Sequence, residues 1–240
     1  MSAAGERIEP HPLDNAVWSA LGTRHQHLSE VRGRARRYRT NVSVFGAVDS
    51  FDAGSWDDLA GLIGPSRTCA LFRRELPESV PAGWTVRARG HGRQMTLGVG
   101  QLVGVKPLDV RRLTAEDVPL MLELVATTNP GPFRPATIEM GRYYGHFEGE
   151  RLLSMAGERL GFEGYTEISA VCTHPDAWGR GLASALTHHV ASGIFARGER
   201  PFLHVADTND AARRVYEHVG FIERQMVSFA LVEAPPAPPD

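Results

Sequence analysis

Apolar residues recur at two different spacings in the first half of the chain, and their order predicts an α/β arrangement. The stretch Leu13–Leu21 places its apolar side chains near one helical face. The runs Val42–Val48 and Thr68–Phe72 are typical of buried strands. We expect Ser55 to cap a helix over Trp56–Ile63 between them. These elements form one β-α-β unit.

Two more strands are expected before the middle of the chain, at Trp84–Arg89 and Gln94–Val99, and the glycines between them predict a hairpin. Arginines also crowd the stretch 32–39. Such a cluster could bind a phosphate or a nucleic-acid backbone. Internal pairing or solvation fits better, because the chain as a whole is not basic.

A change of pattern near Lys106 marks the expected domain boundary. A strand at Leu108–Leu113 is followed by a helix over Ala115–Ala126 that carries an apolar stripe. The first half, judged only from its strand-helix-strand order, could be a degenerate copy of the second. The predicted division is a smaller N-terminal α/β domain (1–106), a second domain (107–233) and a Pro-rich disordered tail (234–240).

The segment Asn129–Ala136 contains three prolines and one glycine, which makes it a candidate substrate loop. A helix is expected over Thr137–Tyr144. A hairpin through Gly149 and Glu150 should then lead into a strand at Leu152–Arg159.

Strict alternation over Thr166–Thr173 predicts a central strand, with Glu167 and Val171 on one face and Cys172 on the other. A helix over Gly181–Arg197 follows, because apolar residues repeat every four positions. The remaining elements are a strand at Phe202–Ala206, a helix from Asn209 to Val219 that Gly220 ends, and one or two strands within Phe221–Val232.

Composition restricts the class of protein. Apolar residues make up 42% and charged residues 22% of the 240, an ordinary globular mixture. A net charge of −2 supplies no overall field for nucleic acid or an anionic membrane, so neither is an expected partner. Cys69 and Cys172 are far apart, and Met1–Asn15 lacks the apolar core of a signal peptide. We therefore expect a cytoplasmic protein.

The stretch from Val171 to Ala183 combines a strand, a turn with glycines and a helix start. Glycines allow a ligand to approach the backbone closely, and the free amides at a helix N-terminus favour negative charge. The pattern suits a pyrophosphate, although many such turns only join a strand to a helix.

A second segment, Asn209 to Phe221, strengthens that interpretation. Asn209 and Tyr216 are seven residues apart, which places them on one helical face about 10 Å apart along the axis. Together the two segments resemble the GNAT N-acetyltransferase superfamily, whose hallmark is an Arg/Gln-x-x-Gly-x-Gly/Ala turn. Gly181 and Ala183 match it, whereas Trp178 stands where Arg or Gln is usual. The second segment matches at every position of Asn-x-x-Ala-x-x-x-Tyr-x-x-x-Gly-Phe.

The resemblance, which covers about Leu108–Val232, implies a mixed α+β GNAT fold in the C-terminal half and acetyl-CoA as co-substrate. The acceptor would be a small-molecule or peptide amine. The implied cofactor-binding residues are Val171, Cys172, Thr173, Trp178, Gly179, Arg180, Gly181, Leu182, Ala183, Ser184, Asn209 and Tyr216.

The chemistry of amine acetylation calls for a base, and the resemblance implies two further roles. An alkylamine is mostly protonated at neutral pH and attacks only when neutral, so a base is needed, and Glu167 on the central strand is the candidate. A salt bridge is the alternative role for this carboxylate. The resemblance makes the amide of Val171 the donor to the oxyanion, and Tyr216 the acid for the leaving thiolate. A core tyrosine is the alternative for Tyr216.

The histidines and cysteines suggest no metal or nucleophile site. His188 and His189 are adjacent on a predicted helix and cannot easily share a ligand, and no histidine pair has zinc-ligand spacing. Cys172 is interpreted as a structural thiol. A non-catalytic acyl-CoA-binding regulatory module remains the rival to an enzyme. The N-terminal domain could cover the acceptor site or form a homodimer surface.

Overall fold

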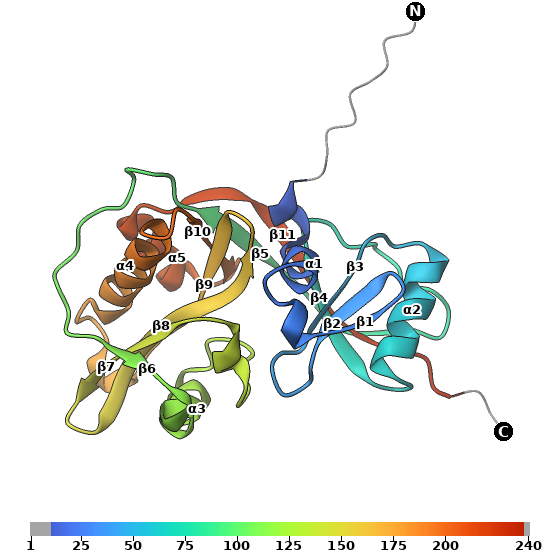
Figure 1. The fold of residues 1–240 in the computed structure, drawn as a ribbon, viewed down its shortest axis with the longest axis horizontal. Helices are drawn as coiled ribbons and strands as arrows, with labels where there is room; N and C mark the ends of the chain where they lie inside the picture. The colour runs from blue at the N-terminus through green and yellow to red at the C-terminus, as the bar shows by residue number, and fades with distance from the viewer. Residues whose placement is uncertain (1–10, 238–240) are drawn as a thin grey trace, which may run out of the picture.

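The computed structural model describes residues 11–237, and within that range the strands join into a single sheet. Its order is β1-β2-β3-β4-β11-β5-β10-β9-β8-β7-β6 (Figure 1). The strands are β1 (Ser29–Arg32), β2 (Ala35–Tyr38), β3 (Phe45–Val48), β4 (Thr68–Arg73), β5 (Thr85–Thr96), β6 (Arg111–Leu113), β7 (Tyr143–Glu148), β8 (Arg151–Phe162), β9 (Tyr165–Thr173), β10 (Arg200–Ala206) and β11 (Ile222–Glu233).

The helices pack on the sheet in two groups. The α-helices are α1 (Ala16–Gly22), α2 (Ala53–Ile63), α3 (Val118–Thr128), α4 (Leu182–Phe195) and α5 (Asp210–Val219), and the 3-10 turns are η1 (Pro12–Asn15), η2 (Gln26–Leu28), η3 (Ala115–Asp117), η4 (Thr137–Met140) and η5 (Pro175–Ala177). In the C-terminal half, α4 and α5 lie together on one side of β8–β10 and α3 lies on the other (Figure 1). The predicted mixed α+β class is confirmed.

One apolar cluster joins the two halves of the chain. Val17 and Leu21 on α1 share a buried core with Leu160, Phe162 and Phe202 from β8 and β10. Burial of such apolar area is the main stabilising contribution available to the contact between the halves. The position of the boundary at 106/107 stays a prediction, but the core crosses it.

The hairpin predicted between Trp84 and Val99 is wrong, because this stretch forms the single strand β5. It pairs antiparallel with β11 on one edge and β10 on the other. Gly92 serves close approach rather than a turn, because a Cβ there would lie 2.8 Å from the carbonyl oxygen of Val205, whereas a Cβ on Gly90 would meet no atom within 4 Å.

Three local predictions need correction. The helix expected over Thr137–Tyr144 shrinks to η4, and Tyr143 already begins β7. The cap of α2 is Asp52, whose Oδ1 accepts the N–H of Ser55 at 2.9 Å, so the helix starts before Ser55. The arginine-rich stretch 32–39 lies on the hairpin of β1 and β2, which the charge pattern did not predict.

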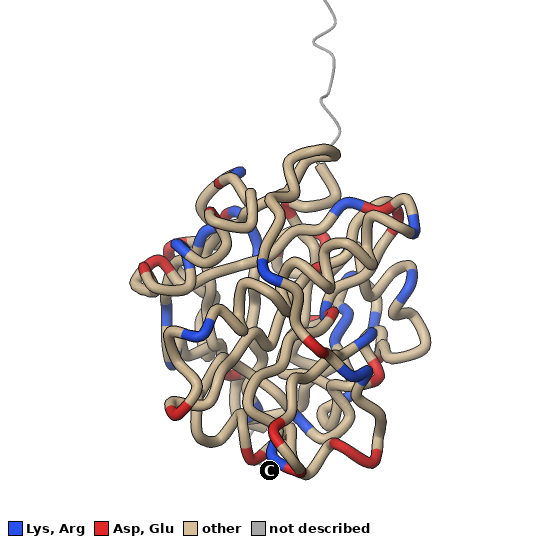
Figure 2. The backbone as a smooth tube through the Cα atoms, turned by 90° about the vertical axis from the view of Figure 1, so that its left-hand side faces the viewer, with Lys and Arg blue, Asp and Glu red and all other residues tan. Residues whose placement is uncertain are grey.

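The arginines of that hairpin are internally paired, as the less specific interpretation expected. Arg37 bonds Glu30 at 2.6 Å and Arg39 bonds Glu139 at 2.7 Å, while Arg36 stacks over the ring of Trp18. Figure 2 shows basic and acidic positions interleaved along the backbone on the side it draws. Most of these cations therefore already have partners.

The chain remains anchored beyond the start of the predicted tail. Ala234 is buried and its N–H donates to the carbonyl of Arg67, and the carbonyl of Pro235 accepts the N–H of Ser66. Residues 238–240 of that tail lie outside the described range.

Candidate active site

The central strand β9 separates from its neighbour β10 halfway along its length. The two pair in parallel only over Tyr165–Ile168 and Arg200–Leu203. Past that point β10 continues alongside β5, and β9 continues alongside β8. The backbone edge of β9 from Ser169 to Thr173 therefore faces the gap between the strands. An exposed strand edge can hydrogen-bond an extended ligand.

A bulge sits at the point of separation. Ala170 has a φ of 52°, in the left-handed region that a residue with a Cβ seldom occupies. The β8–β9 ladder shifts register here and passes over Ala170 and Val171. Strain of this kind persists only where the surroundings impose it, and it is frequent at ligand sites.

The bulge overturns the expectation that Glu167 and Val171 share a face. Val171 packs with Ile168 against the α4–α5 cluster. Glu167 points to the opposite side, where it meets Arg159 and His204. Cys172, predicted on the face away from Glu167, packs in the cluster under α3. Strict period-two alternation fails because the bulge inserts one residue.

The turn between β9 and α4 leaves room for a ligand against the backbone. Gly179 and Gly181 have φ values of 75° and 76°, and a Cβ placed on either would meet no atom within 4 Å. Gly181 is the N-cap of α4 and supplies no side chain to satisfy the first amides of the helix. These amides and the helix dipole favour an anion.

A pocket of about 570 Å³ extends from this turn to the gap between β9 and β10. It is lined by Val171, Cys172, Thr173, Ala177, Trp178, Gly179, Gly181, Leu182, Ala183, Ser184, Ala211, Ala212, Val215 and Tyr216. The structure thus brings together all the predicted cofactor-binding residues except Arg180 and Asn209. Sequence reasoning missed Ala177, Ala211, Ala212 and Val215. Ala212 could have been found, because it lies four residues before Tyr216 on the same helical face.

The two predicted residues outside the lining have partners of their own. Oδ1 of Asn209 accepts the N–H of Ala212 at 3.0 Å, so the side chain caps α5. Arg180 is exposed and pairs with Glu148 across the turn. Binding of a ligand by the guanidinium of Arg180 would compete with its ion pair, whereas Asn209 has engaged only Oδ1 and keeps its amide donors.

Tyr216 presents its hydroxyl toward the pocket. The residue is 8% exposed, and its hydroxyl makes no hydrogen bond within residues 11–237. Burial raises the pKa of this phenol above its ordinary value, so it stays protonated at neutral pH. A protonated hydroxyl without a protein partner can donate to a ligand atom.

Glu167 occupies a closed polar cluster. Its carboxylate receives two hydrogen bonds from Arg159, at 2.7 and 2.6 Å, and a third from Nδ1 of His204 at 2.6 Å. Burial alone would raise the pKa of this fully buried carboxyl, but the Arg159 guanidinium outweighs burial and lowers the pKa to about 2. Glu167 is therefore ionised and fully hydrogen-bonded at neutral pH.

The cluster continues toward the N-terminal half. Nε2 of His204 lies 3.0 Å from Nε2 of Gln94, which also donates to the carbonyl of Leu13 at 2.9 Å. This arrangement fits a neutral imidazole with its proton on Nδ1, and burial lowers the pKa of His204 in the same sense. Oε1 of Gln94 accepts from Arg224 at 2.8 Å.

A small hollow lies on the other side of β9 from the pocket. It is lined by Pro130, Gly131, Pro132, Phe133, Thr137, Tyr143, Arg159, Ser169 and Ala170, so the predicted substrate loop forms one wall. The hydroxyl of Tyr143 is buried here without a hydrogen-bond partner. Burial raises the pKa of this phenol as well.

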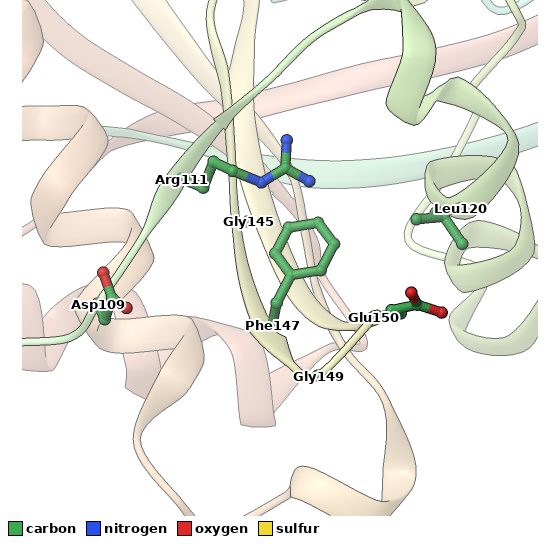
Figure 3. A pocket seen from close by; sticks show the side chains of 7 residues that line it. All are labelled: Asp109, Arg111, Leu120, Gly145, Phe147, Gly149 and Glu150. Carbon is green, nitrogen blue, oxygen red and sulfur yellow. The ribbon is translucent and has the colours of Figure 1, made fainter.

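Another surface hollow, lined by residues of β6, β7 and α3, is shown in Figure 3. Its cation is already engaged: Arg111 stacks over the ring of Phe147 at 4.3 Å and pairs with Asp117 at 2.8 Å. Among the described residues, no group of three or more His, Cys, Asp or Glu could hold a metal ion. No helix in that range is long and apolar enough to cross a membrane.

Comparisons with known proteins agree with this geometry. The family model for FR47-like proteins matches residues 143–230. A protein of Novosphingobium aromaticivorans assigned to the GNAT family of acetyltransferases is 35% identical, with 94% of this chain and 99% of that one covered and a TM-score of 0.85. A GCN5-related N-acetyltransferase from Kribbella flavida shares the fold at 17% identity, covering 92% and 95% of the two chains with a TM-score of 0.57. Curated sequences gave no match.

A fold with a split central strand and an open helix-start turn, together with these similarities, defines an acyltransferase. The chain belongs to the GNAT family of acetyltransferases. Membership implies use of an acyl-CoA.

Proposed function

We propose that the protein transfers the acetyl group of acetyl-CoA directly to a primary amine. The observation that carries this proposal is the pocket itself: it joins unpaired helix-start amides to a tyrosine hydroxyl that has no protein partner. CoA has a pyrophosphate for the first and a thioester sulfur for the second. Gly179 and Gly181 fit this donor, because side chains there would occupy the space of the phosphates.

The free edge of β9 supports binding of the donor's arm in an extended conformation. Val171 has no pairing partner in the β8–β9 ladder, so in this proposal its N–H is available to a ligand. In the proposed reaction this N–H donates to the carbonyl oxygen of the acetyl group as it gains negative charge.

The proton balance gives Tyr216 its role. The neutral amine attacks the acetyl carbon, an amide bond forms, and the carbon–sulfur bond breaks with its electron pair on sulfur. The thiolate then takes the proton of Tyr216, or is held by a hydrogen bond from it, and water returns the proton to the phenolate. The raised pKa keeps Tyr216 protonated but makes it a weaker acid than the thiol, so the proton transfer must be concerted with bond breaking, or the hydroxyl only stabilises the thiolate by a hydrogen bond.

Glu167 stays the predicted acceptor of the amine's proton. It lines neither hollow, so the proton would have to travel through a water or a neighbouring side chain. Arg159 lines the smaller hollow and bonds Glu167, but its guanidinium stays protonated and cannot accept the proton, which leaves a water as the carrier. The alternative role for Glu167 is a buried ion pair that shapes the site. Its hydrogen bonds with Arg159 and His204 support that role.

We propose that the N-terminal half supports the loop beside the smaller hollow, whose volume of about 10 Å³ admits a water and not an amine. The segment 134–139 is fastened to the turn 39–42: Arg134 donates to the carbonyl of Thr40 at 2.6 Å, and Thr137 Oγ1 donates to that of Val42 at 2.7 Å. The Arg39–Glu139 pair adds a third tie. These ties hold the segment 134–139 against the N-terminal half, and in this proposal they order the acceptor side of the site. A homodimer surface on the same half stays a prediction.

A cytoplasmic location is also part of the proposal, supported by Cys69 and Cys172, which are both buried and unpaired.

The test is a screen of amines with acetyl-CoA in which released thiol is detected, accompanied by calorimetry of donor binding. We expect binding of acetyl-CoA and turnover with at least one primary amine. Binding without turnover across small-molecule and peptide amines would favour the regulatory module. Absence of donor binding would refute the proposal.

A further inference from the structure

Trp178 is the most unusual side chain at the donor pocket. It is 69% exposed, whereas the other three tryptophans are buried or half-buried. It also stands where the family motif has Arg or Gln. A large exposed aromatic at the wall of a pocket is more informative than one on an open surface, because ligand sites place aromatic faces against their ligands.

The polar edge of the indole is already used. Its Nε1–H donates to the carbonyl oxygen of Thr173 at 2.8 Å, and the backbone N–H of Trp178 donates to the carbonyl of Pro175 at 3.1 Å. Ala177, just before it, is fully buried. The ring is therefore held in place by its edge, which leaves its apolar face to the pocket.

The same bond changes what Thr173 can offer. The Thr173 carbonyl lies on the free edge of β9 and already accepts one hydrogen bond, from the indole, so it has one lone pair left for a ligand. A ligand lying here gains less from a hydrogen bond to that oxygen and more from contact with the ring. Trp178 thus supplies apolar area at the position where the Arg or Gln of the family motif could contact a phosphate.

We propose that the indole face of Trp178 packs against the pantetheine arm of the donor, next to its branched, apolar pantoyl part. The inference rests on the proposed function. Tyr216 and Val171 mark the thioester end of the pocket, and the amides after Gly181 mark the pyrophosphate end. Trp178 lines the same pocket and is bonded to Thr173, where β9 ends and leads into the turn, so we assign the segment of CoA beside it to the arm that joins the two ends.

Intrinsic fluorescence tests this assignment with the full chain. Titration with acetyl-CoA should change the tryptophan emission, whereas adenosine 3′,5′-bisphosphate, which lacks the arm, should leave it unchanged at concentrations that bind. The response should vanish in Trp178→Phe and survive in Trp18→Phe, the matched control, because Trp18 stacks on Arg36 away from the pocket. A signal that persists in Trp178→Phe, or one that the bisphosphate also produces, would overturn the inference.

Calorimetry gives a second, independent reading. Trp178→Ala should weaken acetyl-CoA binding about 10-fold, since it removes a whole aromatic contact. Trp178→Phe should stay within about 3-fold of wild type, because a ring face remains. Equal affinity in wild type and Trp178→Ala overturns the inference and leaves the proposed function intact. A wild-type chain that binds no acetyl-CoA defeats the proposed function itself. Thermal unfolding of each variant establishes that it is folded.

Discussion

The pocket at the start of α4 and the Glu167 cluster lie on opposite sides of β9. They differ in whether their polar groups have hydrogen-bond partners within the protein. Along the pocket, the amides at the start of α4 and the hydroxyl of Tyr216 have no side-chain partner among residues 11–237. In the cluster, the carboxylate of Glu167 takes three hydrogen bonds and is fully buried.

The polar groups along the pocket are free to bond a ligand, whereas those of the Glu167 cluster already bond one another and stabilise the fold. An unpaired polar atom in a protein costs free energy unless water or a ligand satisfies it, so its survival points to binding. A buried ion pair is already satisfied, and removing one partner leaves the other charge stranded. Variants on the two sides should therefore fail in different measurements.

The largest expected effect is on stability. Glu167→Ala leaves Arg159 buried without its carboxylate, which should cost about 3–5 kcal/mol of unfolding free energy. Urea unfolding measures it. Glu148→Ala, which breaks the exposed pair with Arg180, is the control and should leave the midpoint unchanged. Equal midpoints for wild type and Glu167→Ala would show that the cluster is not structural.

The same pair predicts how stability depends on pH. The folded pKa of Glu167 is about 2, below its ordinary value of 4.5, so the unfolded chain takes up the proton first as pH falls. The pair's contribution is present above about pH 4.5 and is lost as pH falls toward 2. The acid unfolding curve of wild type should therefore be steeper in this window than that of Glu167→Gln, if the latter folds.

That pKa also sharpens the test of Glu167 as a base. Its titration would place an acidic limb of the rate profile near pH 2, so a limb near neutrality must belong to another group or to the amine. If Glu167 is the base, Glu167→Gln should be slow at neutral pH and recover partly at high pH, where free amine is supplied by solvent. A wild-type rate and profile in folded Glu167→Gln would exclude that role.

Next in size is the effect of Tyr216→Phe on turnover. The variant keeps the ring contact with Phe221 and deletes the hydroxyl, so kcat should fall roughly 10²-fold while the Kd for acetyl-CoA stays unchanged. Steady-state kinetics on an amine found in the screen measures both. Wild-type turnover would return Tyr216 to a packing role.

The smallest expected effect concerns the turn. Gly181→Asp places a negative side chain against the phosphates and should weaken acetyl-CoA binding by about 10-fold or more. Gly164→Asp is a matched control, since Gly164 has a φ of 75° and equally open surroundings at the β8–β9 turn. Similar losses in the two variants would mean that backbone strain, not the phosphate site, explains the result.

The lining of the larger pocket was predictable because its signals are local. The turn from Val171 to Ser184 is contiguous, and the spacing of Asn209 and Tyr216 fixes one helical face. Of the lining, only Ala177 and the α5 residues Ala211, Ala212 and Val215 were not predicted. Element types were predicted well where the period was sustained, as in α4 and β9.

The Glu167 cluster was not predictable because it depends on register between distant strands. Arg159, Glu167 and His204 meet only when β8, β9 and β10 are aligned, and the bulge at Ala170 changes which side chains face them. No sequence spacing encodes the left-handed conformation of an alanine. The ties between 39–42 and 134–139 are likewise visible only in the folded chain.

The place of β5 in the sheet has a consequence for how the chain folds. This strand comes from the first hundred residues, yet its two neighbours are β10 and β11, near the C-terminus. During synthesis it must wait for more than a hundred residues before either partner leaves the ribosome. Such distant pairings slow folding. The C-terminal half expressed alone would lack a middle strand, so β10 and β11 would present open edges that favour aggregation.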